Sequence, residues 1–232
     1  MASELIPMLI WRDDGVVCTM LLCFLLTLLI YGMSKRYLPR RIKSFFYPGK
    51  SHKPAEPSVM EDVKRVTPLL YLQVSLLVGV LFYDYARDAF QLSRTAFISM
   101  AHIGIFAVVS LLMLLFKNGL YGLVHNVFFP APQRQLWAEH ISLINLVESL
   151  LLFVLTVLAV FMPFSPMVTL YSLVITLLLV KIFLLFKAFT TFFKKKHGVL
   201  HIFVYFCALE AVPLVVLWAT LMVTANRLIP LL

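Results

Sequence analysis

The chain has 232 residues, of which 62% are hydrophobic and 13% are charged, and its mean hydropathy is +0.95. This composition cannot form an apolar core within a polar shell, so it excludes the ordinary soluble classes. The formal net charge of +9 is also found in nucleic-acid-binding proteins. Here, however, the basic residues flank apolar segments, which favours anionic membrane lipid over nucleic acid as the partner.

Six apolar segments of about twenty residues follow one another along the chain, each long enough to cross roughly 30 Å of hydrocarbon as a helix. They are predicted at residues 15–33, 66–83, 95–116, 141–162, 167–186 and 199–223. The segments are apolar on every side and do not alternate, which excludes a membrane β-barrel and leaves helices. We therefore predict an all-α, polytopic transmembrane helix bundle that forms a single integral membrane domain over residues 1–232.

The first connection, residues 34–65, carries the heaviest positive charge. Nine of the 20 Lys and Arg residues lie here, two follow the third span and four follow the fifth, against four on the alternate side. Because basic connections stay in the cytoplasm, both termini are predicted on the non-cytoplasmic side. Anionic lipid headgroups are the predicted partner of the cytoplasmic face, and a cytosolic docking protein is the alternative. The predicted lipid contacts are Arg36, Arg40, Arg41, Lys43, Lys194, Lys195 and Lys196.

Residues 118–129, which follow the third predicted span, also have a helical pattern. Apolar residues such as Leu120 and Leu123 recur at helical spacing opposite polar ones such as Asn118. About a dozen residues are too few to cross the bilayer. This pattern predicts a short interfacial or re-entrant helix that ends before Pro130.

Three charged side chains interrupt the apolar segments: Glu148 in the fourth, Lys181 in the fifth and Glu210 in the sixth. A charge at mid-bilayer costs about 2.5 to 3.5 kcal/mol, so such residues carry most of the functional information in a membrane protein. At 1.5 Å per residue, all three lie about 8 to 15 Å from the predicted cytoplasmic ends of their spans, so the depths permit contact. Asn145 shares the helical face of Glu148.

The state of these charges has alternatives. Lys181 either extends to the headgroups or pairs with a glutamate, and Glu210 is either protonated or held by Lys181. Pro213 cannot donate to the carbonyl oxygen of Leu209, which predicts a kink beside Glu210. His201 stands four residues after His197. That spacing occurs in metal sites, but no third ligand is in reach, so His201 joins the candidate polar site and we predict no metal or other cofactor.

Enzyme motifs are missing from the sequence: it has no HExxH, no GxSxG and no glycine-rich phosphate loop. We therefore predict a non-enzymatic membrane protein. The first hypothesis is a binding or assembly component of the cell envelope, with a membrane protein or a second copy as partner. The alternative is a small transporter, lipid translocator or ion-coupled carrier that uses Glu148, Lys181 and Glu210. A polar cavity at these residues would favour the alternative.

The C-terminal third carries a resemblance to a known family. Residues 187–189 (Lys-Ala-Phe), the basic turn at 194–197 and the segment at 203–214 resemble the C-terminal signature of an uncharacterised bacterial family of integral membrane proteins. That family is classed as a domain of unknown function and is associated with the Bacteroidota. The similarity extends back through residues 121–129. It implies a bacterial inner-membrane location and supplies no catalytic residue.

Overall fold

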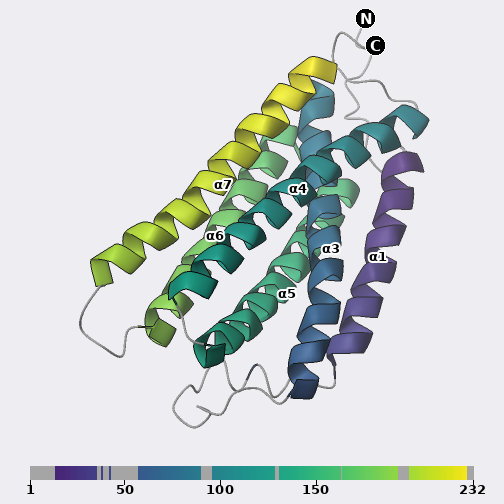
Figure 1. Ribbon diagram of the computed structural model, residues 1–232. Helices are drawn as coiled ribbons and strands as arrows, with labels where there is room; N and C mark the ends of the chain where they lie inside the picture. Colours follow the sequence, from purple (N-terminus) through teal and green to yellow (C-terminus); the bar gives the residue numbers. More distant parts are fainter. Residues whose placement is uncertain are drawn as a thin grey trace, which may run out of the picture.

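The computed structural model describes residues 14–35, 38, 42, 57–89, 96–128, 131–162, 164–192 and 199–228. These residues form long α-helices and no strand: α1 (Asp14–Ser34), α3 (Pro57–Ala89), α4 (Ala96–Phe128), α5 (Ala131–Phe161), α6 (Pro166–Phe192) and α7 (Val199–Leu228) (Figure 1). Each of the six contains a segment long and apolar enough to cross a membrane. The predicted all-α bundle with six spans is confirmed.

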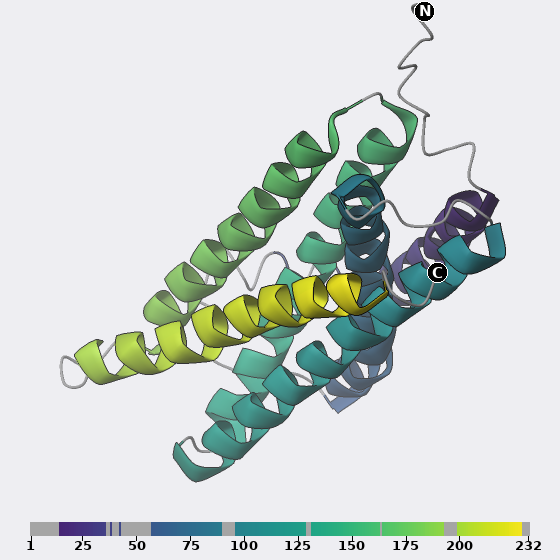
Figure 2. The same ribbon diagram turned by 90° about the horizontal axis from the view of Figure 1, so that it is seen from above.

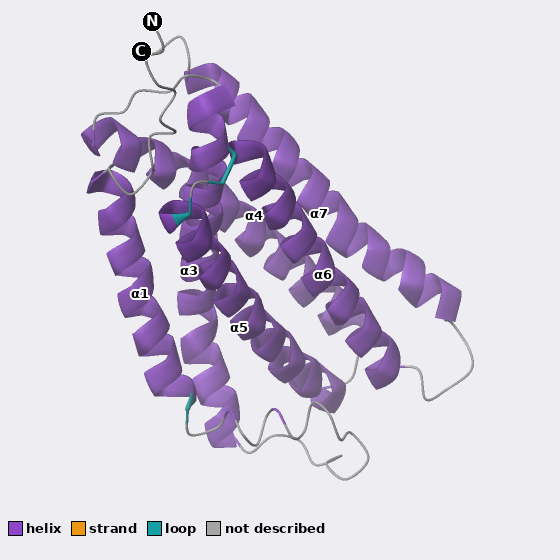
Figure 3. Cartoon of the chain, turned by 180° about the vertical axis from the view of Figure 1, so that it is seen from behind, coloured by secondary structure: helices purple, strands orange, loops and turns teal. Residues whose placement is uncertain are grey.

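Successive helices run in opposite directions, so α1 begins and α7 ends at the same end of the bundle (Figures 1 and 3). We name this the outer end and the opposite one the inner end, after the predicted orientation. Helices α1 and α4 end at the inner end, and α3 and α5 begin there. The depth of a residue in any of the six helices can therefore be measured from the same end of the bundle.

The helix at the centre of the bundle is α3, which packs against α1, α4, α5 and α6 (Figure 2). Its span is 72% buried, whereas the other five are 28 to 50% buried. Phe82 and Tyr83 are fully buried on α3, while the peripheral α1 exposes Leu21 and Phe24. An apolar side chain on the outside of a membrane bundle meets lipid rather than water, so these exposed residues carry no penalty.

The contact between α3 and α4 is the most extensive in the bundle and depends on a glycine. A Cβ placed at Gly79 would lie 3.0 Å from the carbonyl oxygen of Ile103 and 3.1 Å from the amide nitrogen of Ala107. Small residues at such positions let two backbones approach closely in a membrane. At the edge of the bundle, α7 packs mainly on α4, and only 28% of its span is buried.

Two predicted boundaries are corrected. Residues 118–128 are not a separate interfacial or re-entrant helix but the continuation of α4, which ends at Phe128. The physical reason is that neither Gly119 nor Gly122 breaks the helix, and the first residue that cannot continue it is Pro130. At the other boundary, α3 begins at Pro57, so residues 57–65 of the predicted connection are helical.

Candidate functional site

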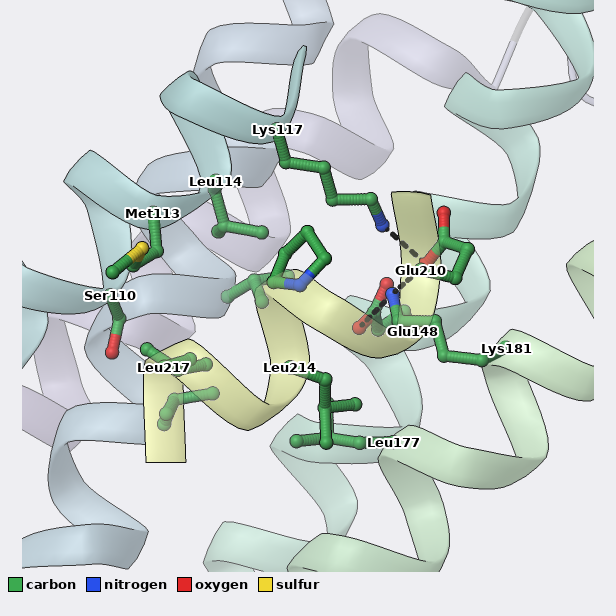
Figure 4. Close-up of a pocket in the computed structure, with 13 residues that line it drawn as sticks. Ser110, Met113, Leu114, Lys117, Glu148, Leu177, Lys181, Glu210, Leu214 and Leu217 are labelled. Carbon is green, nitrogen blue, oxygen red and sulfur yellow. Dashed lines mark hydrogen bonds and ion pairs between the residues drawn. The ribbon is translucent and has the colours of Figure 1, made fainter. Parts of the chain in front are cut away.

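Four charged side chains from four helices meet in the inner half of the bundle (Figure 4). They are Lys117 of α4, Glu148 of α5, Lys181 of α6 and Glu210 of α7. Lys117, Lys181 and Glu210 each lie about three turns from the inner end of their helices. Because neighbouring helices are antiparallel, residues at matching depths face one another although they are far apart in sequence.

The two lysines and two glutamates form a continuous charge network. Lys117 Nζ lies 2.6 Å from Glu210 Oε2, and Lys181 Nζ lies 3.6 Å from the same oxygen and 3.5 Å from Glu148 Oε1. The hydroxyl of Tyr121 donates a hydrogen bond to Glu210 Oε1. Both oxygens of Glu210 are therefore engaged, and the charges of the four residues sum to zero.

The side chains of the network are buried or nearly buried within the bundle. The side chains of Glu148 and Glu210 are 5% and 3% exposed, and those of both lysines are 15% exposed. Removing an ion from water costs several kcal/mol even after relaxation, and pairing offsets this cost without reliably exceeding it. A buried network is thus weak evidence for a stabilising role, whereas charges within a membrane span are by default functional candidates.

A cavity of about 50 Å³ lies against the network. The four charged residues and Ser110 line it, together with an apolar wall made by Val74, Val78, Met113, Leu114, Leu177, Pro213, Leu214 and Leu217. One buried water needs roughly 10 to 15 Å³ of such space and two to four polar partners. The cavity is therefore large enough to hold water beside the charged residues on its polar side.

Comparison with protein-family models gives a match over residues 16–221, to a family described as a domain of unknown function, DUF4271. The chain belongs to the DUF4271 family. The match contains all four charged residues of the network, together with Gly79, Ile103 and Ala107 of the α3–α4 contact. The predicted resemblance to a domain of unknown function is thereby confirmed, over more of the chain than the C-terminal segments indicated. Among curated proteins and solved structures, nothing matches.

In this DUF4271 protein, the residues predicted from the sequence are only partly brought together. The pairing of Lys181 with both glutamates is confirmed, so Glu210 is ion-paired rather than isolated. Asn145 does not join the network; it lies beside Tyr71 of α3. The side chain of His201 and the predicted lipid contacts from Arg36 to Lys43 and from Lys194 to Lys196 lie outside the described residues.

No group of three or more His, Cys, Asp or Glu side chains that could hold a metal ion occurs in the described part of the chain. Pro213 lies within α7, which continues as a helix on both sides of it, and its ring forms part of the cavity wall. The kink at Pro213 stays a prediction.

Sequence reasoning missed Lys117 and Tyr121. Lys117 was assigned to a cytoplasmic connection because the third span was ended at residue 116, whereas α4 continues for three more turns. The apolar residues at helical spacing beyond it were a usable signal, since no proline separates them from the span. Read as one helix, they place Lys117 and Tyr121 on one face, four residues apart.

Proposed function

We propose that this protein is a non-enzymatic, ion-coupled carrier of the bacterial inner membrane, in which Lys117, Glu148, Lys181 and Glu210 form the coupling centre. The observation that carries the proposal is the convergence of these four charges on a cavity that can hold water. The sequence alone ranked a binding or assembly role first. The cavity moves the carrier ahead of it, because a dry, sealed core would have no means of exchanging an ion.

The cost of the network supports this role. Well-packed apolar residues often replace buried ion pairs with no loss of stability or with a gain, so four helices could be joined more cheaply. A group that must change its charge state during a cycle cannot be replaced in this way. Glu210 is the best placed for such a change, because among the described residues it alone contacts both lysines and a tyrosine.

The limited packing of α7 supports the proposal that this helix moves during the cycle. Its main packing contact is with α4, and Glu210 adds ion pairs to Lys117 of α4 and Lys181 of α6. Binding of a cation or a proton at Glu210 weakens both pairs at once, and the least buried helix of the bundle then loses its charged tether. A two-state element of this kind is what coupling between ion binding and movement requires.

Charge movement in reconstituted membranes tests the proposal without a known substrate. Proteoliposomes on a solid-supported membrane would be exposed to jumps in proton or sodium concentration. The wild-type protein should give a transient current, and the double variant Lys117→Met/Glu210→Gln should lose at least about nine-tenths of it. This double variant keeps the Lys181–Glu148 pair and the charge balance, so its folding is expected to survive.

The matched control is Glu61→Gln, which removes a carboxylate whose ion pair with Arg65 is 64 to 65% exposed. It should leave the current unchanged, because an exposed pair in the first turns of α3 lies outside the coupling centre. A wild-type protein that gives no transient with either ion, in vesicles where it is shown to be folded, would contradict the carrier.

One observation favours a second candidate function, a role in assembly with a partner protein. It is an apolar groove of about 660 Å³ between α4 and α7. Its lining on α7 extends from Ala208 to Thr224, about 24 Å along the helix axis, most of the hydrocarbon thickness. A lipid chain covers one leaflet, so the length favours a transmembrane helix of a partner protein. Absence of a transient current, together with a stoichiometric partner isolated in mild detergent, would establish this assembly role instead.

A further inference from the structure

Polar side chains form a row along the buried face of α4, and neither the ion pairs nor the packing accounts for all of them. Ser99, His102, Ser110 and Lys117 are separated by three, eight and seven residues, which places them on one face of a helix. Ser99, His102 and Ser110 are 0%, 5% and 1% exposed. The row covers about 27 Å of helix rise, nearly the whole hydrocarbon thickness.

The inner half of this row opens into the charged cavity. The hydroxyl oxygen of Ser110 is buried, lines the cavity and has no hydrogen-bond partner among the described residues (Figure 4). A buried hydroxyl without a partner is costly, and water in a polar cavity is the usual way in which such a group is satisfied. Ser110, Lys117 and Glu210 all line this cavity, so water in it would be the link between the hydroxyl and the charged side chains.

The outer half of the row is built around His102. Its ring is stacked on that of Tyr83 of α3, with 6.3 Å between the centroids, and the hydroxyl of Tyr83 donates to Ser99 Oγ over 2.8 Å. His102 Nδ1 is buried and has no hydrogen-bond partner among the described residues. Imidazole is the side chain that most readily gains and loses a proton near neutral pH.

An apolar segment separates the two halves. Between His102 and Ser110, a distance of about 12 Å along α4, the buried side chains are Ile103, Phe106 and Ala107. Gly79 of α3 closes on this segment through its contacts with Ile103 and Ala107. The row is therefore interrupted between His102 and Ser110, where the backbone of α3 approaches α4 closely at Gly79.

We propose that the coupling ion is the proton and that it crosses the membrane along the α3–α4 interface, with His102 as the outer relay and Ser110 as the inner one. This inference rests on the proposed carrier function. In the balanced sequence, His102 Nδ1 binds a proton from the outer side and releases it to water when the segment at Phe106 opens. Water and the Ser110 hydroxyl then pass one proton to the Glu210 carboxylate, which separates from Lys117 and later releases the proton on the inner side.

The other charged groups at the outer end lie on the helices that pack around α4. Among the described residues, they are Asp14 of α1, Asp84, Arg87 and Asp88 of α3, and Arg227 of α7. Arg87 lies 3.3 Å from Asp88 and 4.0 Å from Asp84 within α3. One guanidinium therefore balances only one of these two carboxylates. Within the row itself, His102 is the side chain that exchanges a proton near neutral pH.

Proton uptake into proteoliposomes that contain a pH-sensitive dye tests this path, with a potassium gradient and valinomycin as the driving force. His102→Gln and Ser110→Ala should each lower the initial rate at least about tenfold. His140→Gln should not, because that buried histidine lies on α5, outside the row. Apparent Tm in detergent, measured for all three variants, shows whether each is folded.

Each outcome has a definite meaning. Proton uptake that depends on Glu210 but is unchanged in both folded row variants would overturn the path and leave the carrier standing. A sodium-driven current that depends on Glu210, without proton uptake, would overturn the proton as coupling ion and also leave the carrier standing. Absence of both ion movements would overturn the carrier and the path together.

Discussion

At the scale of single residues, Glu210 determines how the charges of the inner half are shared. It accepts from Tyr121 and pairs with two lysines, whereas Glu148 contacts Lys181 alone among the described ion pairs. Lys117 also lies 5.7 Å from the centre of the Tyr121 ring. Removing Glu210 therefore disturbs three partners, and removing Lys117 disturbs two.

The pairing of Lys117 with Glu210 predicts a non-additive effect on stability. Glu210→Gln should lower stability by about 3 kcal/mol, because it leaves two buried lysines with one carboxylate. Adding Lys117→Met should recover part of this loss, with a coupling of at least about 1 kcal/mol. Apparent Tm in mild detergent for the wild type, both single variants and the double variant measures it. A Glu210→Gln protein as stable as the wild type would mean that Glu210 is already protonated and not ion-paired.

The sequence shows where single charged residues lie in the spans but does not show which of them pair. The sequence located Glu148, Lys181 and Glu210 because each interrupts an apolar segment, and their depths permitted contact. Which of them pair depends on which helices are neighbours, and no spacing along one helix contains that information. Lys117 was not among the predicted site residues, because it directly follows residue 116, the predicted end of the third span.

At the scale of helices, α4 connects every functional feature of the molecule. Its inner half carries Lys117 and Tyr121, its middle carries Ser110, and its outer half carries His102 and Ser99. One face meets α3 at Gly79, and another meets α7 along the apolar groove. Had α4 ended at the predicted boundary, the charge network would have lost its second lysine.

The close approach of α3 and α4 predicts opposite results for two glycines. Gly79→Ala should lower stability by about 1 to 3 kcal/mol, because the new Cβ meets backbone atoms of Ile103 and Ala107 that cannot move aside. Gly104→Ala is the matched control on the facing helix: no atom lies within 4 Å of its Cβ position. Alanine there should be neutral or stabilise by up to about 1 kcal/mol. Thermal unfolding in detergent compares the two variants, and equal Tm values would show that the helices can separate at no cost.

At the scale of the whole molecule, the distribution of Lys and Arg predicts which end of the bundle faces the cytoplasm. Six antiparallel helices place the start of α1 and the end of α7 together, whichever side that is. The structure thus shows that the start of α1 and the end of α7 lie at the same end of the bundle. The Lys and Arg distribution predicts which side of the membrane that end faces. We propose that the shared end of α1 and α7 faces the non-cytoplasmic side, as this distribution predicts.

Labelling of single cysteines tests this orientation. In a variant whose Cys18, Cys23 and Cys207 are replaced by Ala, Ser165→Cys in the connection before α6 should react with a membrane-impermeant maleimide in intact spheroplasts. Ser51→Cys, in the basic first connection, should react only after permeabilisation. The reverse pattern would invert the bundle and reverse the direction assigned to the proton path, while the contacts within the site would stay the same.

The sequence by itself determined that the protein lies in a membrane, that it is all-helical and that it has six spans. Each of these follows from local hydropathy and from the need to satisfy backbone hydrogen bonds in lipid. It also located three of the four charged residues of the network. Only the tertiary structure decided that Lys117 belongs with them and that Asn145 does not. It also decided that a cavity lies beside the network, lined by residues of α3, α4, α5, α6 and α7. The reason is physical: hydropathy is a property of one segment, whereas ion pairs and cavities depend on which segments pack together and at what depth.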